Sequence, residues 1–112
     1  MRLFFILASI LASSCSSTGY SSADRQVSDC FAMSIVYKNM AEFTNAPSEQ
    51  KRSMEVLNRH YTSVFQNTVA RLSEKDGDVN GYSAMTKKTM RQVADAPLEW
   101  KDRFINCAPQ RT

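Results

Sequence analysis

The residues of this 112-residue chain that could carry chemistry are few: three cysteines, one histidine and one loop rich in Asp, Asn and Gly. The cysteines, Cys15, Cys30 and Cys107, lie far apart and form no Cys-x-x-Cys pair, the spacing typical of thiol redox sites. Cys30 and Cys107 both fall among apolar residues, where a thiol is usually unreactive. Catalysis by a thiol pair is therefore not indicated.

The loop over residues 76–82 carries oxygen ligands at the spacing of the first half of an EF-hand calcium loop. The candidate ligands are the side chains of Asp76, Asp78 and Asn80 and the backbone carbonyl of Tyr82. The position where a bidentate Glu normally closes the site is Lys87, and a cation there opposes calcium binding. Because Asp-Gly and Asn-Gly are also common turn formers, a plain helix connection is favoured and a weak calcium site is the alternative.

A metal, haem or catalytic centre finds little support elsewhere in the chain. His60 is the only histidine, and its neighbours one helical turn away, Val56 and Val64, are not metal ligands. The methionines fit core positions, where Met commonly fills gaps, better than an axial haem position. No nucleophile stands with a recognisable base, and no Gly-rich phosphate loop follows a strand. The sequence predicts a protein that is not an enzyme and needs no cofactor.

Residues 1–14 have the features of a secretory signal peptide: a positive charge at Arg2, an apolar stretch over 3–11 and small residues before Cys15. The stretch is too short for a permanent span, which needs about 20 residues. Leu11-Ala12-Ser13-Ser14-Cys15 resembles the processing site of bacterial lipoproteins, although Ala12 stands where that family usually has Leu. The resemblance implies that Cys15 is acylated; ordinary cleavage after a small residue is the alternative.

The rest of the chain divides into a short tether and one domain. Residues 15–22 are mainly small and polar without charge, and we interpret them as a flexible tether. Residues 23–112 suit a single small domain. Export would place this domain in the oxidising periplasm or at the envelope membrane, where Cys30 and Cys107 are expected to form a disulfide. The loop it closes spans 107 minus 30, or 77, residue steps, and chain entropy assigns such a loop about 4.5 kcal/mol.

Four helices and no strands are expected, because apolar residues recur at spacings of three and four and nowhere alternate. The first, over 22–43, is apolar nearly all round in its middle, as a helix enclosed by others is, and its apolar face continues through Met40 and Phe43. The others are expected over 47–74, over 82–94 and from Pro97 onward. The predicted fold is an all-α four-helix domain held by one disulfide.

The charge of the chain argues against a nucleic-acid partner. The formal net charge is +3 and falls to +2 without Arg2, which is too little for a face that neutralises phosphates. Lys87, Lys88 and Arg91 form the densest basic cluster, and no aromatic residue is interleaved with it, as on a solvated helix face. Contact with a membrane is expected through the lipid anchor alone.

The sequence therefore predicts an exported envelope protein that binds another protein through an exposed helix face. Its layout of two cysteines bracketing a small helical domain is similar to that of some periplasmic immunity proteins, so immunity against a toxin or an accessory role in an envelope assembly would both fit. Trp100, Tyr20 and Tyr82 are candidate anchor residues, because aromatic side chains dominate binding hot spots, and a core position is the alternative for Trp100. A carrier of a small apolar ligand between the helices remains a further alternative.

Overall fold

The computed structural model describes residues 20–75 and 77–107, and these form four α-helices. The helices are α2 (Ser22–Phe43), α3 (Ser48–Glu74), α4 (Val79–Asp95) and α5 (Pro97–Ile105). Within these two ranges there is no strand, and the predicted all-α four-helix fold is confirmed. None of the described helices has the length and hydropathy needed to span a membrane.

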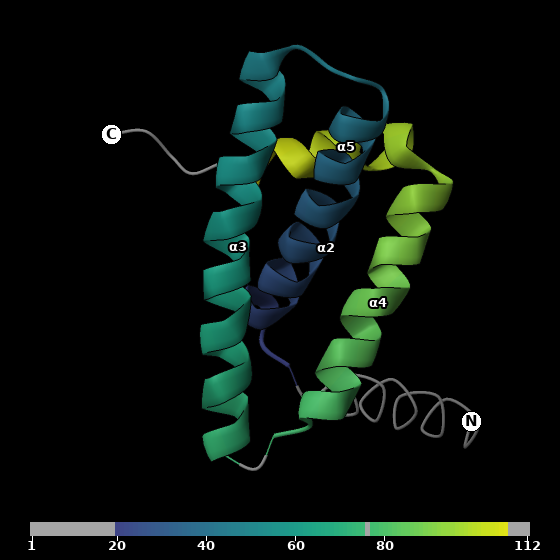
Figure 1. Ribbon diagram of the computed structural model, residues 1–112. Helices are drawn as coiled ribbons and strands as arrows, with labels where there is room; N and C mark the ends of the chain where they lie inside the picture. Colours follow the sequence, from purple (N-terminus) through teal and green to yellow (C-terminus); the bar gives the residue numbers. More distant parts are fainter. Residues whose placement is uncertain (1–19, 76, 108–112) are drawn as a thin grey trace, which may run out of the picture.

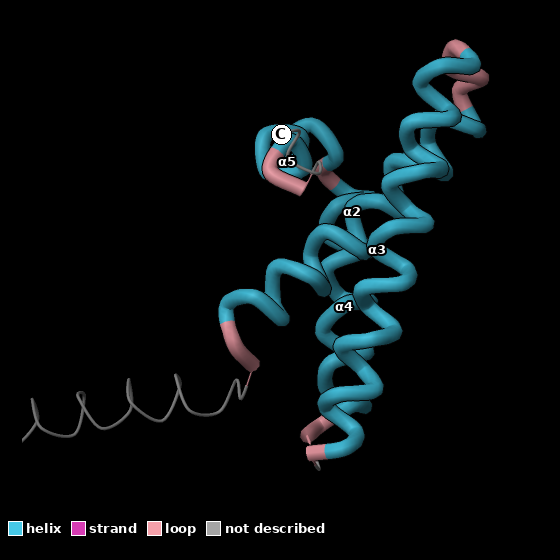
Figure 2. The backbone as a smooth tube through the Cα atoms, turned by 90° about the vertical axis from the view of Figure 1, so that its left-hand side faces the viewer, coloured by secondary structure: helices cyan, strands magenta, loops and turns pink. Residues whose placement is uncertain are grey.

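Helix α2 is the central element, because it packs against each of the other three helices. In Figure 1 it lies between α3 and α4, which make far fewer contacts with each other than with α2. Figure 2, turned by a quarter, shows α5 nearly end-on, so this short helix crosses the direction of α2 and α3. The apolar pattern all round the middle of α2 thus corresponds to a helix with neighbours on several sides.

Side chains and tight turns set the helix ends. The hydroxyl oxygen of Ser21 accepts the backbone N–H of Asp24 at 3.1 Å and caps α2. Asp78 caps α4 in the same way, its carboxylate accepting the N–H of Gly81 at 2.8 Å. After α2 the chain reverses through Asn45, whose φ of 54° lies in the left-handed region that Asn tolerates better than most residues. The close of α2 and the start of α3 therefore make a tight hairpin.

The folded domain begins earlier than the sequence suggested. The ring of Tyr20 packs edge-on against Tyr82 with centroids 5.2 Å apart, and its hydroxyl donates to the carbonyl of Asp78 at 2.9 Å. Ser22 already lies in α2. Residues 20–22 belong to the domain, so the tether predicted over 15–22 is too long at that end. Cys15 itself lies outside the described residues.

The inward faces of α3 and α4 carry Leu57, Leu72, Tyr82 and Val93, all of which are buried. The end of α2 is different, because Met40 is 38% exposed and Phe43 is 92% exposed. Helical periodicity identifies an apolar face but not whether a neighbour reaches far enough to cover it. Figure 2 shows the α2–α3 hairpin continuing beyond α5, which leaves the last turn of α2 partly uncovered.

Candidate functional site

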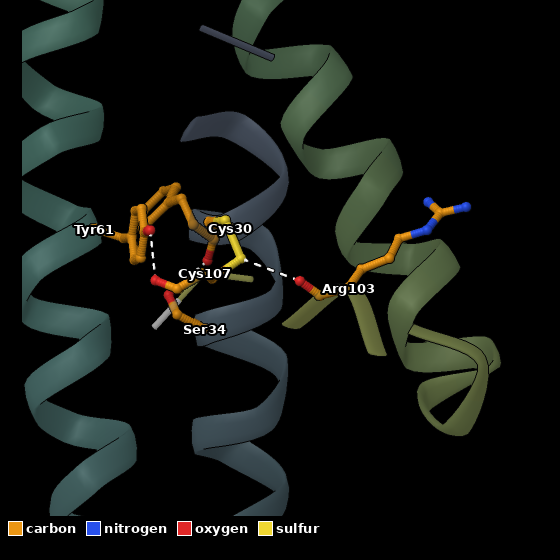
Figure 3. Close-up of a disulfide and its surroundings, with 6 residues drawn as sticks. Cys30, Ser34, Tyr61, Arg103 and Cys107 are labelled. Atoms are coloured by element: carbon orange, nitrogen blue, oxygen red, sulfur yellow. Dashed lines mark hydrogen bonds between the residues drawn. A yellow bond between two sulfur atoms is a disulfide. The ribbon is translucent and has the colours of Figure 1, made fainter. Parts of the chain in front are cut away.

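The disulfide joins the middle of α2 to the short segment that follows α5. Cys30 and Cys107 are bonded, with Cα atoms 5.5 Å apart, and both are almost completely buried. The carbonyl of Cys107 also accepts the hydroxyl of Tyr61, from α3, at 2.6 Å (Figure 3). Three helices are thus fixed at one point, and the predicted pairing is confirmed. The buried sulfurs give this site a structural role.

The candidate calcium ligands do not form an open loop. Helix α4 begins at Val79, so Asn80 and Tyr82 lie within it, whereas an EF-hand loop stays open until the position held here by Lys87. The carboxylate of Asp78 is engaged with the helix cap, and the carbonyl of Tyr82 accepts the hydroxyl of Thr86 at 3.0 Å. Asp76 lies outside the described residues. In the described part of the chain, no three His, Cys, Asp or Glu side chains gather as a metal site would need.

Gly81 lies where two neighbouring side chains closely approach the backbone of α4. A Cβ atom at this position would lie 2.1 Å from a carboxylate oxygen of Asp78 and 2.7 Å from the hydroxyl of Tyr20. Position 81 therefore requires a glycine, because the capping carboxylate of Asp78 and the hydroxyl of Tyr20 lie close to its backbone. The Asp-x-Asn-Gly pattern marks the start of a helix.

Tyr82 is a core residue, and its prediction as a binding anchor is wrong. Its side chain is fully buried and stacks on Phe65, with centroids 5.4 Å apart. Its hydroxyl donates to the backbone carbonyl of Asp24 at 2.5 Å. Burial, reinforced by the nearby Asp24 carboxylate, raises the pKa of Tyr82 from 10.0 to about 12. The same Asp24 carboxylate forms an ion pair with Arg71.

The other two predicted anchors are also committed to the fold. Tyr20 packs on Tyr82 as described above. Trp100 packs against the core around the disulfide and carries the guanidinium of Arg103 over its ring, 4.3 Å from the centroid. His60 is exposed and lies edge-on to the ring of Tyr61. None of these side chains stands out as a free apolar anchor.

Two of the exposed apolar side chains, Met40 and Leu98, line a groove where α5 meets the α2–α3 hairpin. The groove has a volume of about 330 Å³. Its apolar lining consists of Tyr37, Met40, Ala41, Met54, Pro97, Leu98 and Phe104, and its polar lining of Thr44, Gln50 and Lys101. The side chain of Leu98, on the α5 wall, is 84% exposed. We call this feature the α5 groove.

Tyr37 builds the floor of the α5 groove. Its hydroxyl donates to the carbonyl of Pro97 at 2.5 Å and so holds the start of α5 against α2. Its ring packs on Phe104 with centroids 4.6 Å apart. Lys101, one turn after Leu98, is exposed at the edge and takes no part in the ion pairs that the described residues form with one another. The groove therefore has an apolar floor and one positive charge at its rim.

Sequence reasoning missed the α5 groove, although α5 contained a signal for it. On the helical wheel of α5, Leu98 and Ile105 share one face and Trp100 lies on the opposite one, with Lys101 and Phe104 between them. Large apolar residues on both faces of a nine-residue helix indicate that one face is not covered by the domain itself. Ile105 is 65% exposed, in agreement with this placement.

A second hollow, of about 440 Å³, lies between Lys38 of α2 and the polar face of α3. Its walls are long polar side chains, among them Glu55, Arg59 and Gln66, and no aromatic residue lines it. Glu55 and Arg59 form an exposed ion pair at 3.9 Å. A surface of this kind is typical of a solvated helix face, so the α5 groove is the better candidate site.

The chain was also compared with known proteins. No protein-family model, curated protein or solved structure matches it, and its function is therefore argued from its own geometry.

Proposed function

We propose that this protein is an exported, lipid-anchored envelope protein that binds a partner protein through the α5 groove. The observation that carries the proposal is the concentration of uncovered apolar side chains at this one end of the domain. Leu98 and Met40 flank the groove, and Phe43 lies one helical turn beyond Met40. Contiguous exposed apolar surface on a small domain is typical of an interaction site.

Two further features support the envelope location. Residues 1–15 combine a signal-peptide pattern with a lipoprotein-like cysteine. The Cys30–Cys107 disulfide is the kind of bond that persists in oxidising compartments and is rare in the cytosol. The proposed partner is therefore a protein of the envelope or periplasm, and immunity against a toxin and an accessory role in an assembly both remain compatible with it.

A small apolar ligand in the same groove is the second candidate function. The groove, at about 330 Å³, is at the lower end of the range for ligand pockets, about 300–1,000 Å³. Such pockets bury most of the ligand surface, whereas the Leu98 wall here is largely open to solvent. An inserted side chain of a partner protein, itself continuous with a larger covering surface, suits an open groove better.

The proposal is tested with the full chain expressed in a bacterial host. Intact mass of the membrane fraction, before and after reduction and alkylation, should show a chain that begins at an acylated Cys15 and contains one disulfide. Quantitative co-purification should then compare Leu98→Ser with Val56→Ser, which alters an exposed apolar residue on α3 outside the groove. We expect Leu98→Ser alone to lose a specific partner; equal recovery from both variants would contradict binding through the groove.

A further inference from the structure

We infer that the partner of the α5 groove is an amphipathic helix that inserts apolar side chains between α5 and the α2–α3 hairpin and places a carboxylate beside Lys101. This inference rests on the proposed function and specifies the chemistry of the partner. Four properties of the groove lead to it: the state of its backbone groups, its single charge, its methionine side chains, and its distance from the tether.

Three backbone carbonyls around the groove already accept hydrogen bonds within the domain. The carbonyl of Met40 accepts the N–H of Thr44 at 2.9 Å, that of Ala41 accepts the N–H of Ala46 at 2.9 Å, and that of Pro97 accepts the hydroxyl of Tyr37. The walls are the sides of helices, and no sheet edge exists among residues 20–75 and 77–107. An extended peptide would bury N–H and C=O groups without partners, whereas a helix satisfies its own.

The charge at the groove favours an acidic partner. Lys101 is the only charged side chain among the lining residues, and it makes no ion pair with the other described residues. A carboxylate one turn away from the apolar anchors of a docked helix would reach this ammonium group. Because Lys101 is exposed at the rim, such a pair would add little affinity but would favour an acidic partner over a basic one.

Methionine side chains make the groove adaptable to the inserted residues. Met40 from α2 and Met54 from α3 line the hairpin side of the groove, opposite Leu98 on α5. Unbranched, polarizable thioethers adjust their shape to different apolar partners. The groove therefore suits a helix that presents Leu, Ile, Met or Phe at spacings of three and four residues.

The position of the tether argues against a membrane as the occupant. Tyr20 is fixed to the domain through Asp78, and Cys15 precedes it by five residue steps, which span at most about 18 Å. Met40 follows Ser22 by 18 residues along α2, a distance of about 27 Å. A lipid attached to Cys15 therefore cannot reach the membrane while the hairpin end of α2 inserts end-on. Figure 1 shows the groove elements α5 and the α2–α3 hairpin at the end of the bundle opposite the start of α2.

The test is a binding selection with the full mature chain, purified with its disulfide intact. Two display libraries are panned in parallel, one of scaffolded helices with a randomised face and one of extended peptides. Liposomes of phosphatidylethanolamine and phosphatidylglycerol form a third arm. Binding sites of the selected ligands are mapped by amide chemical shifts. We expect enrichment of helices with apolar residues at three- and four-residue spacing and an adjacent Asp or Glu, which perturb α5 and the end of α2.

Two variants with a matched control make the outcome decisive. Leu98→Ser should weaken the selected helices by more than about tenfold, because it removes a wall of the groove, and Val56→Ser should not. Lys101→Glu should shift preference by up to about fivefold from Glu-bearing helices to their Lys-bearing counterparts. Both altered residues are exposed, so the variants should keep the circular dichroism of the parent.

Results that contradict a helical partner can be distinguished from results that contradict protein binding through the groove. Groove ligands that are extended, or that keep their affinity in Lys101→Glu, would overturn this inference while leaving protein binding through the groove intact. Selected ligands that bind away from the groove, or liposome binding that Leu98→Ser abolishes, would overturn the proposed function as well.

Discussion

Asp24 and Arg71 form the ion pair most deeply placed in the described structure. The side chain of Asp24 is 9% exposed and that of Arg71 is 45% exposed, and the pair joins the first turn of α2 to the end of α3. Removing the partner of a buried carboxylate leaves a desolvated charge unpaired, which costs more than the net value of the bond. The end of the domain far from the groove is therefore held by electrostatics as well as by packing.

The burial of the Asp24 carboxylate leads to a first prediction. Arg71→Ala should lower the free energy of unfolding by about 1–3 kcal/mol, because the Asp24 carboxylate loses its partner. Arg59→Ala is the matched control: its pair with Glu55 is exposed, and its loss should cost less than about 1 kcal/mol. Urea unfolding of both variants measures the difference. Equal destabilisation would mean that the Asp24–Arg71 pair contributes no more than a surface pair.

The buried phenol of Tyr82 predicts loss of stability at alkaline pH. Its pKa of about 12 in the folded protein exceeds the ordinary 10.0, so the folded state holds this proton more tightly than the unfolded state. The resulting stability is complete below pH 10 and is lost as the pH rises through the interval up to about 12. Two pKa units correspond to a free energy on the order of 3 kcal/mol.

Tyr82→Phe should therefore be less stable than the parent near neutral pH, by about 1 kcal/mol for the lost bond to the Asp24 carbonyl, yet show a shallower decline above pH 10. Burial also raises the pKa values of Tyr20, Tyr37 and Tyr61, so part of the decline should remain. Denaturant unfolding at a series of pH values measures both effects. An unchanged slope in Tyr82→Phe would contradict the assignment of the alkaline effect to this residue.

At the scale of elements, α5 is the weakest part of the fold and also one wall of the groove. It spans nine residues, and none of its own side chains is fully enclosed. Isolated helices of this length are marginal in water. Its position depends on the bond between Tyr37 and Pro97 at its start and on the disulfide just after its end. The disulfide therefore stabilises the groove as well as the chain.

Cys30→Ala with Cys107→Ala should lower the free energy of unfolding by about 2–5 kcal/mol. The loss should be uneven: amide protons of α5 should exchange much faster while those of α2 remain protected in the folded state. Hydrogen exchange followed by mass spectrometry measures this, and Trp100 fluorescence gives an independent signal for α5. Uniform loss of protection in both helices would show that α5 does not detach on its own.

Substitutions at the start of α4 distinguish a helix cap from a calcium site. Asp78→Ala should lower the free energy of unfolding by about 1 kcal/mol in the absence of calcium, because the Gly81 N–H loses its acceptor. Asn80→Ala, which changes a calcium candidate with no capping bond, should cost less. Thermal unfolding with and without millimolar calcium measures both. A calcium-dependent rise in melting temperature that both substitutions abolish would restore the calcium hypothesis.

The spacing of apolar residues in the sequence predicts helices but not how the helices are arranged in space. The spacing of apolar residues correctly predicted four helices, and the disulfide expected for an exported domain correctly paired Cys30 with Cys107. The groove was not predicted, because it forms where α5 crosses the α2–α3 hairpin. The spacing of apolar residues in the sequence does not specify the angle at which two helices cross. For the same reason the exposure of Phe43 was missed, whereas the free outer face of α5, with Leu98, was visible in the spacing.

At the scale of the whole molecule, the domain has two ends with different properties. Tyr20, Asp24, Arg71 and Tyr82 tie together the end at which the tether enters. The opposite end carries the α5 groove and the uncovered last turn of α2. A lipid anchor at Cys15 would hold the first end near a membrane and direct the second toward the surrounding compartment. This polarity is what a tethered binding protein requires.

The most direct measurement of that account is photo-crosslinking in living cells of the native host. A photoreactive amino acid replaces Leu98 on the groove in one strain and Gln66, in the polar hollow on α3, in another. The account predicts a discrete protein adduct from position 98 that is absent from position 66, and loss of that adduct when Met40→Ser is added. Adducts of equal yield at both positions, or adducts with lipid alone at position 98, would contradict a protein-binding role for the groove.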